Sequence, residues 1–273
     1  MGDLTTFARW LNRWELVPDG EPFETRYAKN WLIPVRRNGQ AAILKITTAD
    51  HEIAGGALMA WLAGDGAARV LEREGGALLL ERLPATRSLA DMARAGGDDE
   101  ASRIICAVGD KLHAPRPGPP PETLIPLARW FRALAPAAAA HGGVFGVSLA
   151  AAQALMAEPR DVVVLHGDLH HENVIDGGER GWLIIDPKGL LGERAYEYAT
   201  TLCNPDAALA LKPGRLARQI DVIADAARLD PRRLLHWTLA HAAISAAWCV
   251  TDGFDPAPAL ALAEIAQDLV EAG

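Results

Sequence analysis

Apolar and polar residues alternate through much of the first eighty residues, and this pattern predicts a small antiparallel sheet. The predicted strands are residues 31–35, 40–46, 68–71 and 77–80. Asn38-Gly39 separates the first two strands and can adopt the positive φ angles that a tight hairpin turn needs. Between the two pairs of strands, residues 50–63 place apolar side chains on one helical face. We therefore expect a sheet with one helix packed against it.

After residue 84 the apolar spacing changes to the period of amphipathic helices. The predicted helices are residues 99–113, 124–140, 148–158, 214–228 and 231–251. Asp230-Pro231 begins the last of these with a cap and a proline in the first turn. We expect the apolar stripe on this helix to lie in the core; it comprises Trp237, Ile244 and Trp248.

This change of pattern predicts an α+β protein with two lobes. We place a strand-rich N-terminal lobe, including a short hinge, at residues 1–83 and a helical C-terminal lobe at residues 84–273. A chain of 273 residues is large for a single core and typical of two lobes or domains.

The net charge of the chain indicates which kind of binding partner it favours. The formal net charge of −8 disfavours nucleic acid and anionic membranes and suits a cationic ligand. The apolar run at residues 134–157 is mostly Ala and Gly, so we interpret it as two helices broken at Gly142-Gly143 rather than a membrane span.

The cysteines and the first residues of the chain indicate the cellular compartment of the protein. The chain has three cysteines that lie far apart in sequence, which gives no disulfide framework and is typical of a reducing compartment. Residues 1–14 lack a basic start followed by an apolar run, so we expect no signal peptide and a cytoplasmic location.

Residues 165–174, LHGDLHHENV, concentrate the candidate chemistry. They follow the apolar run 162–165 and precede a predicted hairpin, which brings Asn173 and Asp186 to neighbouring strand ends with Asp168 in the preceding loop. Mg²⁺ prefers such oxygen ligands, and a further carboxylate can accept or orient the proton of an attacking hydroxyl. An Asp, an Asn five residues later and an Asp that ends a strand match the arrangement used in phosphoryl transfer.

The histidines of the same stretch support a competing interpretation, a zinc-binding protein. His166 and His170 are four residues apart, and on a helix they would share a face as zinc ligands. Gly167 and the neighbouring strand disfavour a helix. We expect His166 to make a structural hydrogen bond beneath the metal loop and His170 and His171 to be turn or rim residues.

The segment HGDLHHEN resembles the HGDxxxxN catalytic loop of aminoglycoside phosphotransferases, which are relatives of the protein kinases, and Asp186 in IIDP stands where their metal-binding Asp stands. The longer stretch from LHGDLHHENV to GWLIIDPKGLLGE is similar to the aminoglycoside/hydroxyurea kinase family and, within it, most similar to streptomycin 6-phosphotransferases. The resemblance extends from Trp14 over nearly the whole chain.

This resemblance implies a two-lobed protein-kinase-like fold with ATP and Mg²⁺ as cofactors. In the C-terminal lobe it implies that Asp168 is the catalytic residue that accepts or orients the hydroxyl proton, and that Asn173 and Asp186 hold Mg²⁺. Lys188, just past Asp186, is close enough to touch substrate or phosphate, but we expect it to be a solvated lysine.

The resemblance also assigns residues of the N-terminal, nucleotide-binding lobe. It implies that Lys45 grips the α- and β-phosphates, that Glu52 pairs with Lys45, and that the backbone from Glu81 to Leu83 hydrogen-bonds adenine. The loop at residues 26–30 has no glycine, unlike the phosphate loop of protein kinases, so we assign no residue in it.

Local charge and the resemblance together suggest the substrate. Residues 161–200 contain eight Asp or Glu and three Lys or Arg, an excess that suits a cation, although a solvated acidic rim would look the same. The resemblance implies a monomeric kinase that inactivates an aminoglycoside antibiotic, namely streptomycin at its 6-hydroxyl. Two alternatives remain: a kinase for another small guanidino or hydroxyurea-like substrate, and a nucleotide-binding pseudokinase.

Overall fold

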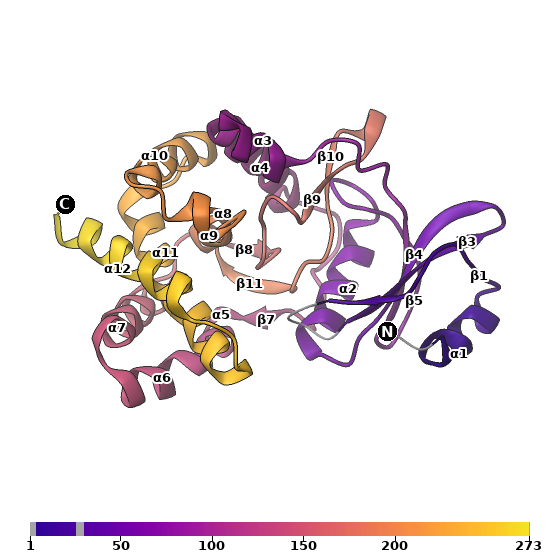
Figure 1. Ribbon diagram of the computed structural model, residues 1–273, viewed down its shortest axis with the longest axis horizontal. Helices are drawn as coiled ribbons and strands as arrows, with labels where there is room; N and C mark the ends of the chain where they lie inside the picture. The colour runs from indigo at the N-terminus through magenta and orange to yellow at the C-terminus, as the bar shows by residue number, and fades with distance from the viewer. Residues whose placement is uncertain (1–3, 26–29, 273) are drawn as a thin grey trace.

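The computed structural model describes residues 4–25 and 30–272, so most of the glycine-free loop at residues 26–30 lies outside the described residues. Figure 1 shows an antiparallel sheet with two helices on one side of the molecule and a mainly helical part on the other. This is the predicted α+β, protein-kinase-like arrangement. The boundary between residues 83 and 84 stays a prediction.

The N-terminal sheet has the strand order β1-β3-β4-β6-β5, with β2 also pairing with β3. Its strands are β1 (Val17–Pro18), β2 (Phe23–Glu24), β3 (Trp31–Arg37), β4 (Gln40–Ile46), β5 (Val70–Glu74) and β6 (Ala77–Glu81). Arg37 pairs with Gln40 across Asn38 and Gly39, both of which have positive φ, so the predicted hairpin is confirmed.

The two faces of this sheet pack against different partners. Helix α1 (Thr5–Arg13) covers one face, where Phe7 joins Leu44 and Leu79 in a small separate core. The other face packs against helix α2 (Asp50–Leu62), and its Leu78 and Leu80 belong to the same core as the helical part. Because side chains alternate along a strand, Lys45 lies on this second face, toward the helical part.

The C-terminal part is built mainly from helices packed around one continuous core. Its helices are α3 (Leu89–Met92), α4 (Asp98–His113), α5 (Leu127–Trp130), α6 (Leu134–His141), α7 (Gly143–Ala157), α8 (Ala199–Leu202), α9 (Ala207–Ala210), α10 (Arg215–Ala227), α11 (Pro231–Asp252) and α12 (Ala257–Ala272). Trp237 and Ile244 of α11 are fully buried as predicted, and Trp248 is half-buried. Within the described chain, no helix is long and apolar enough to cross a membrane.

Five short strands frame the candidate site. Strand β11 (Leu190–Glu193) pairs with β7 (Ile125–Pro126) and β8 (Val162–Leu165), while β9 (Val174–Asp176) and β10 (Trp182–Ile184) form a hairpin. The loop from β8 to β9 carries Asp168, and Asp186 follows β10. The elements near residue 165 therefore place two chemistry-bearing loops side by side.

One predicted helix is wrong, and several helices were missed, α1 among them. Residues 124–140 do not form a single helix, because Ile125 and Pro126 pair with the edge of β11 and the helix restarts at α5 and again at α6. That pairing depends on a partner strand some sixty-five residues away, which local periodicity does not encode. The helix α12 was not predicted, and it packs along α11 and α7.

Candidate active site

A buried glutamate anchors the loop that follows β8. Glu197 is fully buried, and its two carboxylate oxygens accept hydrogen bonds from the backbone N–H groups of His166 (2.7 Å) and Gly167 (2.9 Å). His166 in turn binds the carbonyl oxygen of Ile185 through Nε2 at 2.8 Å, which confirms the structural role expected for it. Sequence reasoning missed Glu197, because its partners are backbone groups thirty residues away.

Asp168 and Asn173 lie against each other in this loop. The Asn173 Nδ2 donates to the carbonyl oxygen of Asp168 at 2.8 Å and lies 3.3 Å from its Oδ2. The side chain of Asp168 is 33% exposed, whereas Asn173 is buried. Asp168 therefore presents a carboxylate to solvent from a loop that its neighbours hold in place.

Asp186 joins the same place from the β9–β10 hairpin. The Ile185 N–H donates to the carbonyl oxygen of Asn173 at 3.0 Å, so the ends of the two strands are tied together. Asp186 itself has φ of 56°, a left-handed conformation that costs energy for a residue with a Cβ atom. Such strain is typical of functional positions, where surrounding contacts hold the residue in place.

The sheet contributes Lys45, which links both parts of the molecule. Its Nζ binds the Glu52 carboxylate of α2 and the Asp186 carboxylate, and only 8% of its side chain is exposed. The structure therefore brings together Lys45, Glu52 and Asp186, which sequence reasoning placed in one nucleotide site.

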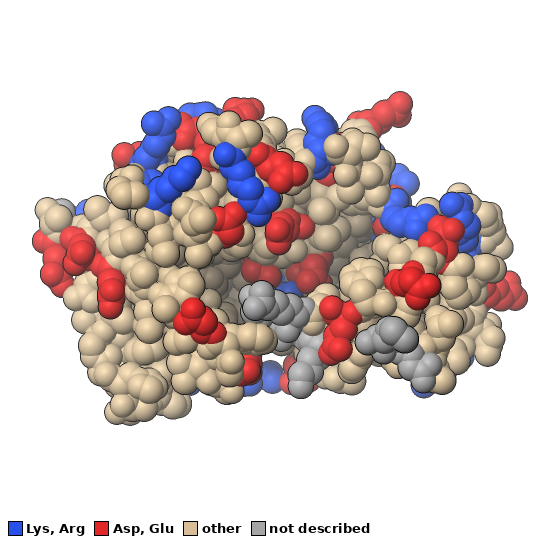
Figure 2. Space-filling view, viewed as in Figure 1, with Lys and Arg blue, Asp and Glu red and all other residues tan. Residues whose placement is uncertain are grey.

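Lys188 is the main correction to the sequence analysis. We expected a solvated lysine, but its side chain is only 11% exposed. Its Nζ lies 2.7 Å from Glu52 Oε1, 3.2 Å from Asp186 Oδ2 and 3.7 Å from Asp168 Oδ2. We name the five side chains Lys45, Glu52, Asp168, Asp186 and Lys188 the acid–lysine cluster. Figure 2 shows the hollow between the two parts of the molecule, with acidic side chains on its walls.

A close approach of backbones sets the geometry of this cluster. A Cβ atom on Gly55 of α2 would lie 1.7 Å from the carbonyl oxygen of Pro187, and one on Gly189 would lie 2.7 Å from the Ala54 carbonyl carbon. Only glycine at these positions lets α2 lie directly on residues 187–189. This contact brings Glu52 within reach of Lys188.

Neighbouring charges shift the pKa values of Asp168, Asp186 and Lys188 toward the ionised forms. Burial acts to raise the pKa of Asp168, but the charges of His170 and Lys188 outweigh it and hold that pKa below its ordinary value. Burial likewise opposes ionisation of Asp186, and Lys188 and Lys45 lower its pKa. Burial acts to lower the pKa of Lys188, but the nearby carboxylates raise it. Asp168, Asp186 and Lys188 therefore stay charged at neutral pH.

The residues present fit a hard divalent cation. The Asn173 Nδ2 is used within the loop, whereas no described residue donates a hydrogen bond to its Oδ1, which leaves this oxygen for a ligand. Asp186, which follows the Ile185 that bonds to the Asn173 backbone, can add carboxylate oxygens. An amide oxygen, a carboxylate and waters form a donor set that Mg²⁺ accepts.

The histidines do not converge as a zinc site would require. Among residues 4–25 and 30–272, no group of three or more His, Cys, Asp or Glu side chains is arranged to hold a metal ion. His170 bonds to Asn173 at 3.1 Å, and burial lowers the pKa of His171 to about 3. His171 lies in a turn, as expected, but it is buried, at 2% exposure, rather than at the rim.

The predicted adenine-binding segment begins at the last residue of β6. The Glu81 N–H donates to the carbonyl oxygen of Arg69, and the Glu81 carboxylate binds Arg180. Leu83 is half-buried, and no backbone hydrogen bond joins it to any part of the chain that the structure describes. The backbone of Leu83 is therefore available to a ligand, whereas the N–H of Glu81 is already used.

Comparisons with known proteins show which family this chain matches. Residues 13–253 match the model of a family described as aminoglycoside/hydroxyurea antibiotic resistance kinase. A streptomycin 3''-kinase of Klebsiella pneumoniae is 46% identical over 248 residues, covering 89% of this chain and 92% of that protein. A streptomycin 6-kinase of Streptomyces griseus is 31% identical over 266 residues, covering 90% of this chain and 82% of that protein.

A solved structure supports the fold independently. The amicoumacin kinase hAmiN, in complex with AMP-PNP, Ca²⁺ and Ami, superposes with a TM-score of 0.69 at 13% identity. The match covers 100% of this chain and 94% of that one. At this level of identity the similarity shows the fold.

Proposed function

The chain belongs to the aminoglycoside/hydroxyurea antibiotic resistance kinase family, and from this premise we propose that it transfers the γ-phosphoryl group of ATP to a hydroxyl of streptomycin. The observation that carries the proposal is the acid–lysine cluster, in which segments more than a hundred residues apart bury paired charges in one cleft. The substrate rests on the streptomycin kinases that match about nine-tenths of the chain.

In the nucleotide site, Lys45 binds the α- and β-phosphates and Glu52 orients it through their ion pair. The backbone at Leu83, together with the segment from Glu81, receives adenine. Asn173 and Asp186 hold Mg²⁺, which when bound neutralises phosphate charge and orients the transferred group. These roles are the ones that the family resemblance implies, and the ion pair of Lys45 with Glu52 supports them.

In the acceptor site, Asp168 receives the substrate hydroxyl. Its carboxylate is ionised and partly exposed, and its loop is anchored by Glu197, so it can orient the hydroxyl and take its proton as the phosphoryl group transfers. Phosphoryl transfer needs little covalent help from the protein, so catalysis rests on positioning and electrostatic stabilisation.

The acceptor hydroxyl has two candidates. The sequence analysis favoured the 6-hydroxyl, and two streptomycin 6-kinases match at 31% and 30% identity. The 46% identity to a 3''-kinase favours the 3''-hydroxyl. Nuclear magnetic resonance of the purified product, which assigns the phosphorylated carbon, separates the two.

The test is ADP release in a coupled assay with a panel of acceptors. We expect release with Mg²⁺, ATP and streptomycin, and little release without an acceptor. Turnover with hydroxyurea or another guanidino compound but not with streptomycin would move the substrate to the alternative class. Nucleotide binding without turnover on any acceptor would support the pseudokinase alternative.

A further inference from the structure

Lys188 has an environment that the roles proposed so far do not use. Its ammonium group is bound to the fully buried Glu52 on one side and faces Asp186 and Asp168 on the other. The side chains of Asp186 and Asp168 are 29% and 33% exposed, so both carboxylates are partly open to solvent. Lys188 is therefore anchored from below and directed toward the place where the reaction occurs.

The N–H donors of the Lys188 ammonium group determine which ligand it can bind. An ammonium group has three N–H donors, and Glu52 takes one of them. The other two are left for Asp186 Oδ2, 3.2 Å from Nζ, and Asp168 Oδ2, 3.7 Å from Nζ. The proposed function assigns these carboxylates to metal binding and to the hydroxyl proton. When those oxygens take up their roles, the two donors can serve an anion that lies between Asp186 and Asp168.

We propose that Lys188 is a catalytic residue that binds the γ-phosphoryl group during transfer. The inference rests on the proposed function, since it assumes that Asp168 and Asp186 mark the two ends of the transfer path. The bond from Pγ to the β-phosphate oxygen breaks, a bond to the substrate oxygen forms, and the hydroxyl proton passes to Asp168. Lys188 stays protonated and donates to the non-bridging oxygens of the transferred group.

The experiment measures how replacing each of two lysines of the cluster changes the affinity for each of two nucleotides. We would measure the affinities of ADP and of AMP-PNP, with Mg²⁺, by calorimetry for the wild type, Lys188→Met and Lys45→Met. Because ADP lacks the γ-phosphoryl group, Lys188→Met should weaken AMP-PNP by about tenfold and leave ADP nearly unchanged. Lys45→Met should weaken both nucleotides.

Turnover supplies the second measurement. Lys188→Met should lower kcat roughly 10²–10³-fold, the usual cost of removing one donor to a transition-state oxygen, with little change in KM for the acceptor. Lys188→Arg should recover part of kcat, because it keeps the charge. Lys111→Met, an exposed lysine on α4, should match the wild type.

Each outcome decides the inference. Equal losses of ADP and AMP-PNP affinity, or unchanged kcat in Lys188→Met, would assign Lys188 a structural role and overturn it. If the wild type phosphorylates no aminoglycoside, the proposed function fails, while the contrast between ADP and AMP-PNP still decides the inference. Circular dichroism checks that each variant is folded. If Lys188→Met does not fold, the same measurements are made on Lys188→Gln.

Discussion

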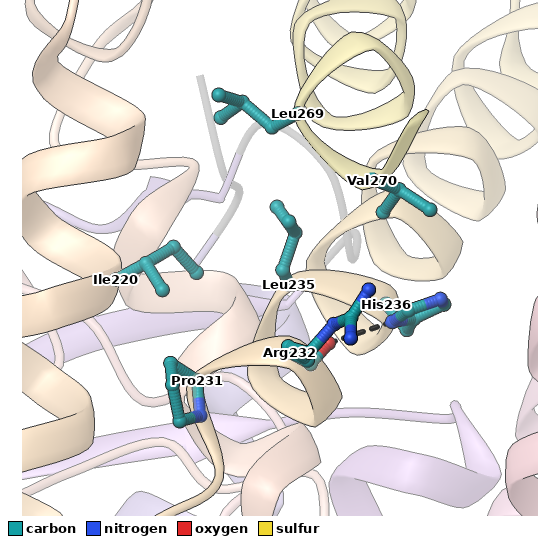
Figure 3. Close-up of a pocket in the computed structure, with 7 residues that line it drawn as sticks. All are labelled: Ile220, Pro231, Arg232, Leu235, His236, Leu269 and Val270. Carbon is teal, nitrogen blue, oxygen red and sulfur yellow. Dashed lines mark hydrogen bonds between the residues drawn. The ribbon is translucent and has the colours of Figure 1, made fainter. Parts of the chain in front are cut away.

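The acid–lysine cluster and the pocket among α10, α11 and α12 show how differently two hollows of one molecule are built. Figure 3 shows the pocket, a cavity of about 170 Å³. Its lining residues are Ile220, Pro231, Arg232, Leu235, His236, Leu269 and Val270. His236 bonds to the carbonyl oxygen of Arg232, one turn earlier on its own helix.

The cluster differs from the pocket in where its partners come from. Lys45 and Asp186 are 141 positions apart, yet they form a largely buried ion pair. Burying charges is costly unless they are paired, so a fold that gathers them from distant segments is typical of a functional site. A hollow lined mainly by apolar side chains, whose histidine is bonded within its own helix, shows no such sign. We therefore place the chemistry in the cluster.

The largest effect is expected at Asp168. Asp168→Ala should lower kcat roughly 10²–10⁴-fold, the range for removing a group that handles a proton, and leave ADP affinity near that of the wild type. Steady-state kinetics and calorimetry measure the two quantities. Undiminished turnover in this variant would remove the reason for placing the acceptor hydroxyl at Asp168.

A pH effect should come from His241, which packs beneath the site with its Nδ1 3.1 Å from the hydroxyl of Tyr196. Burial lowers the pKa of His241 to about 4. The unfolded chain therefore binds more protons between about pH 6.5 and pH 4, and the free energy of unfolding should fall across that range by up to about 3 kcal/mol.

Urea unfolding of the wild type and of His241→Gln at pH 7 and pH 5 measures this contribution. The variant should lose less stability on acidification than the wild type does. Equal losses in the two proteins would show that other groups, such as His171, dominate the acid response.

Adjacent glycines of α2 offer a matched pair for testing the contact with residues 187–189. Gly55→Ala would force a Cβ atom into Pro187 and should cost about 2 kcal/mol together with much of the activity. Gly56→Ala meets only Arg73 and Leu78 at 3.7 Å or more, so it should be tolerated. Thermal unfolding and ADP release compare the two, and equal behaviour would refute the close packing of α2.

The smallest effect is expected in the pocket of Figure 3. Leu269→Gln places a polar side chain at its wall and should change stability by less than about 1 kcal/mol, because Leu269 is only partly buried. Its kcat and KM should match the wild type. A loss of activity would mean that the pocket takes part in function and would break the comparison.

Features set by neighbouring residues could be predicted from the sequence. Asn38-Gly39 specified a hairpin, and the spacing of Asp168, Asn173 and Asp186 indicated that a loop and a strand end would meet. Features set by distant partners could not. Lys188 looks like a surface lysine until α2 packs on it through Gly55, and the pairing of β7 with β11 overrides a helical pattern.

The central claim is that the acid–lysine cluster transfers a phosphoryl group to streptomycin. The most direct measurement is the mass of streptomycin after incubation with the enzyme, Mg²⁺ and ATP. We expect a gain of one phosphoryl group with the wild type and none with Asp186→Ala. Unmodified streptomycin with the wild type, or full modification with Asp186→Ala, would contradict the account.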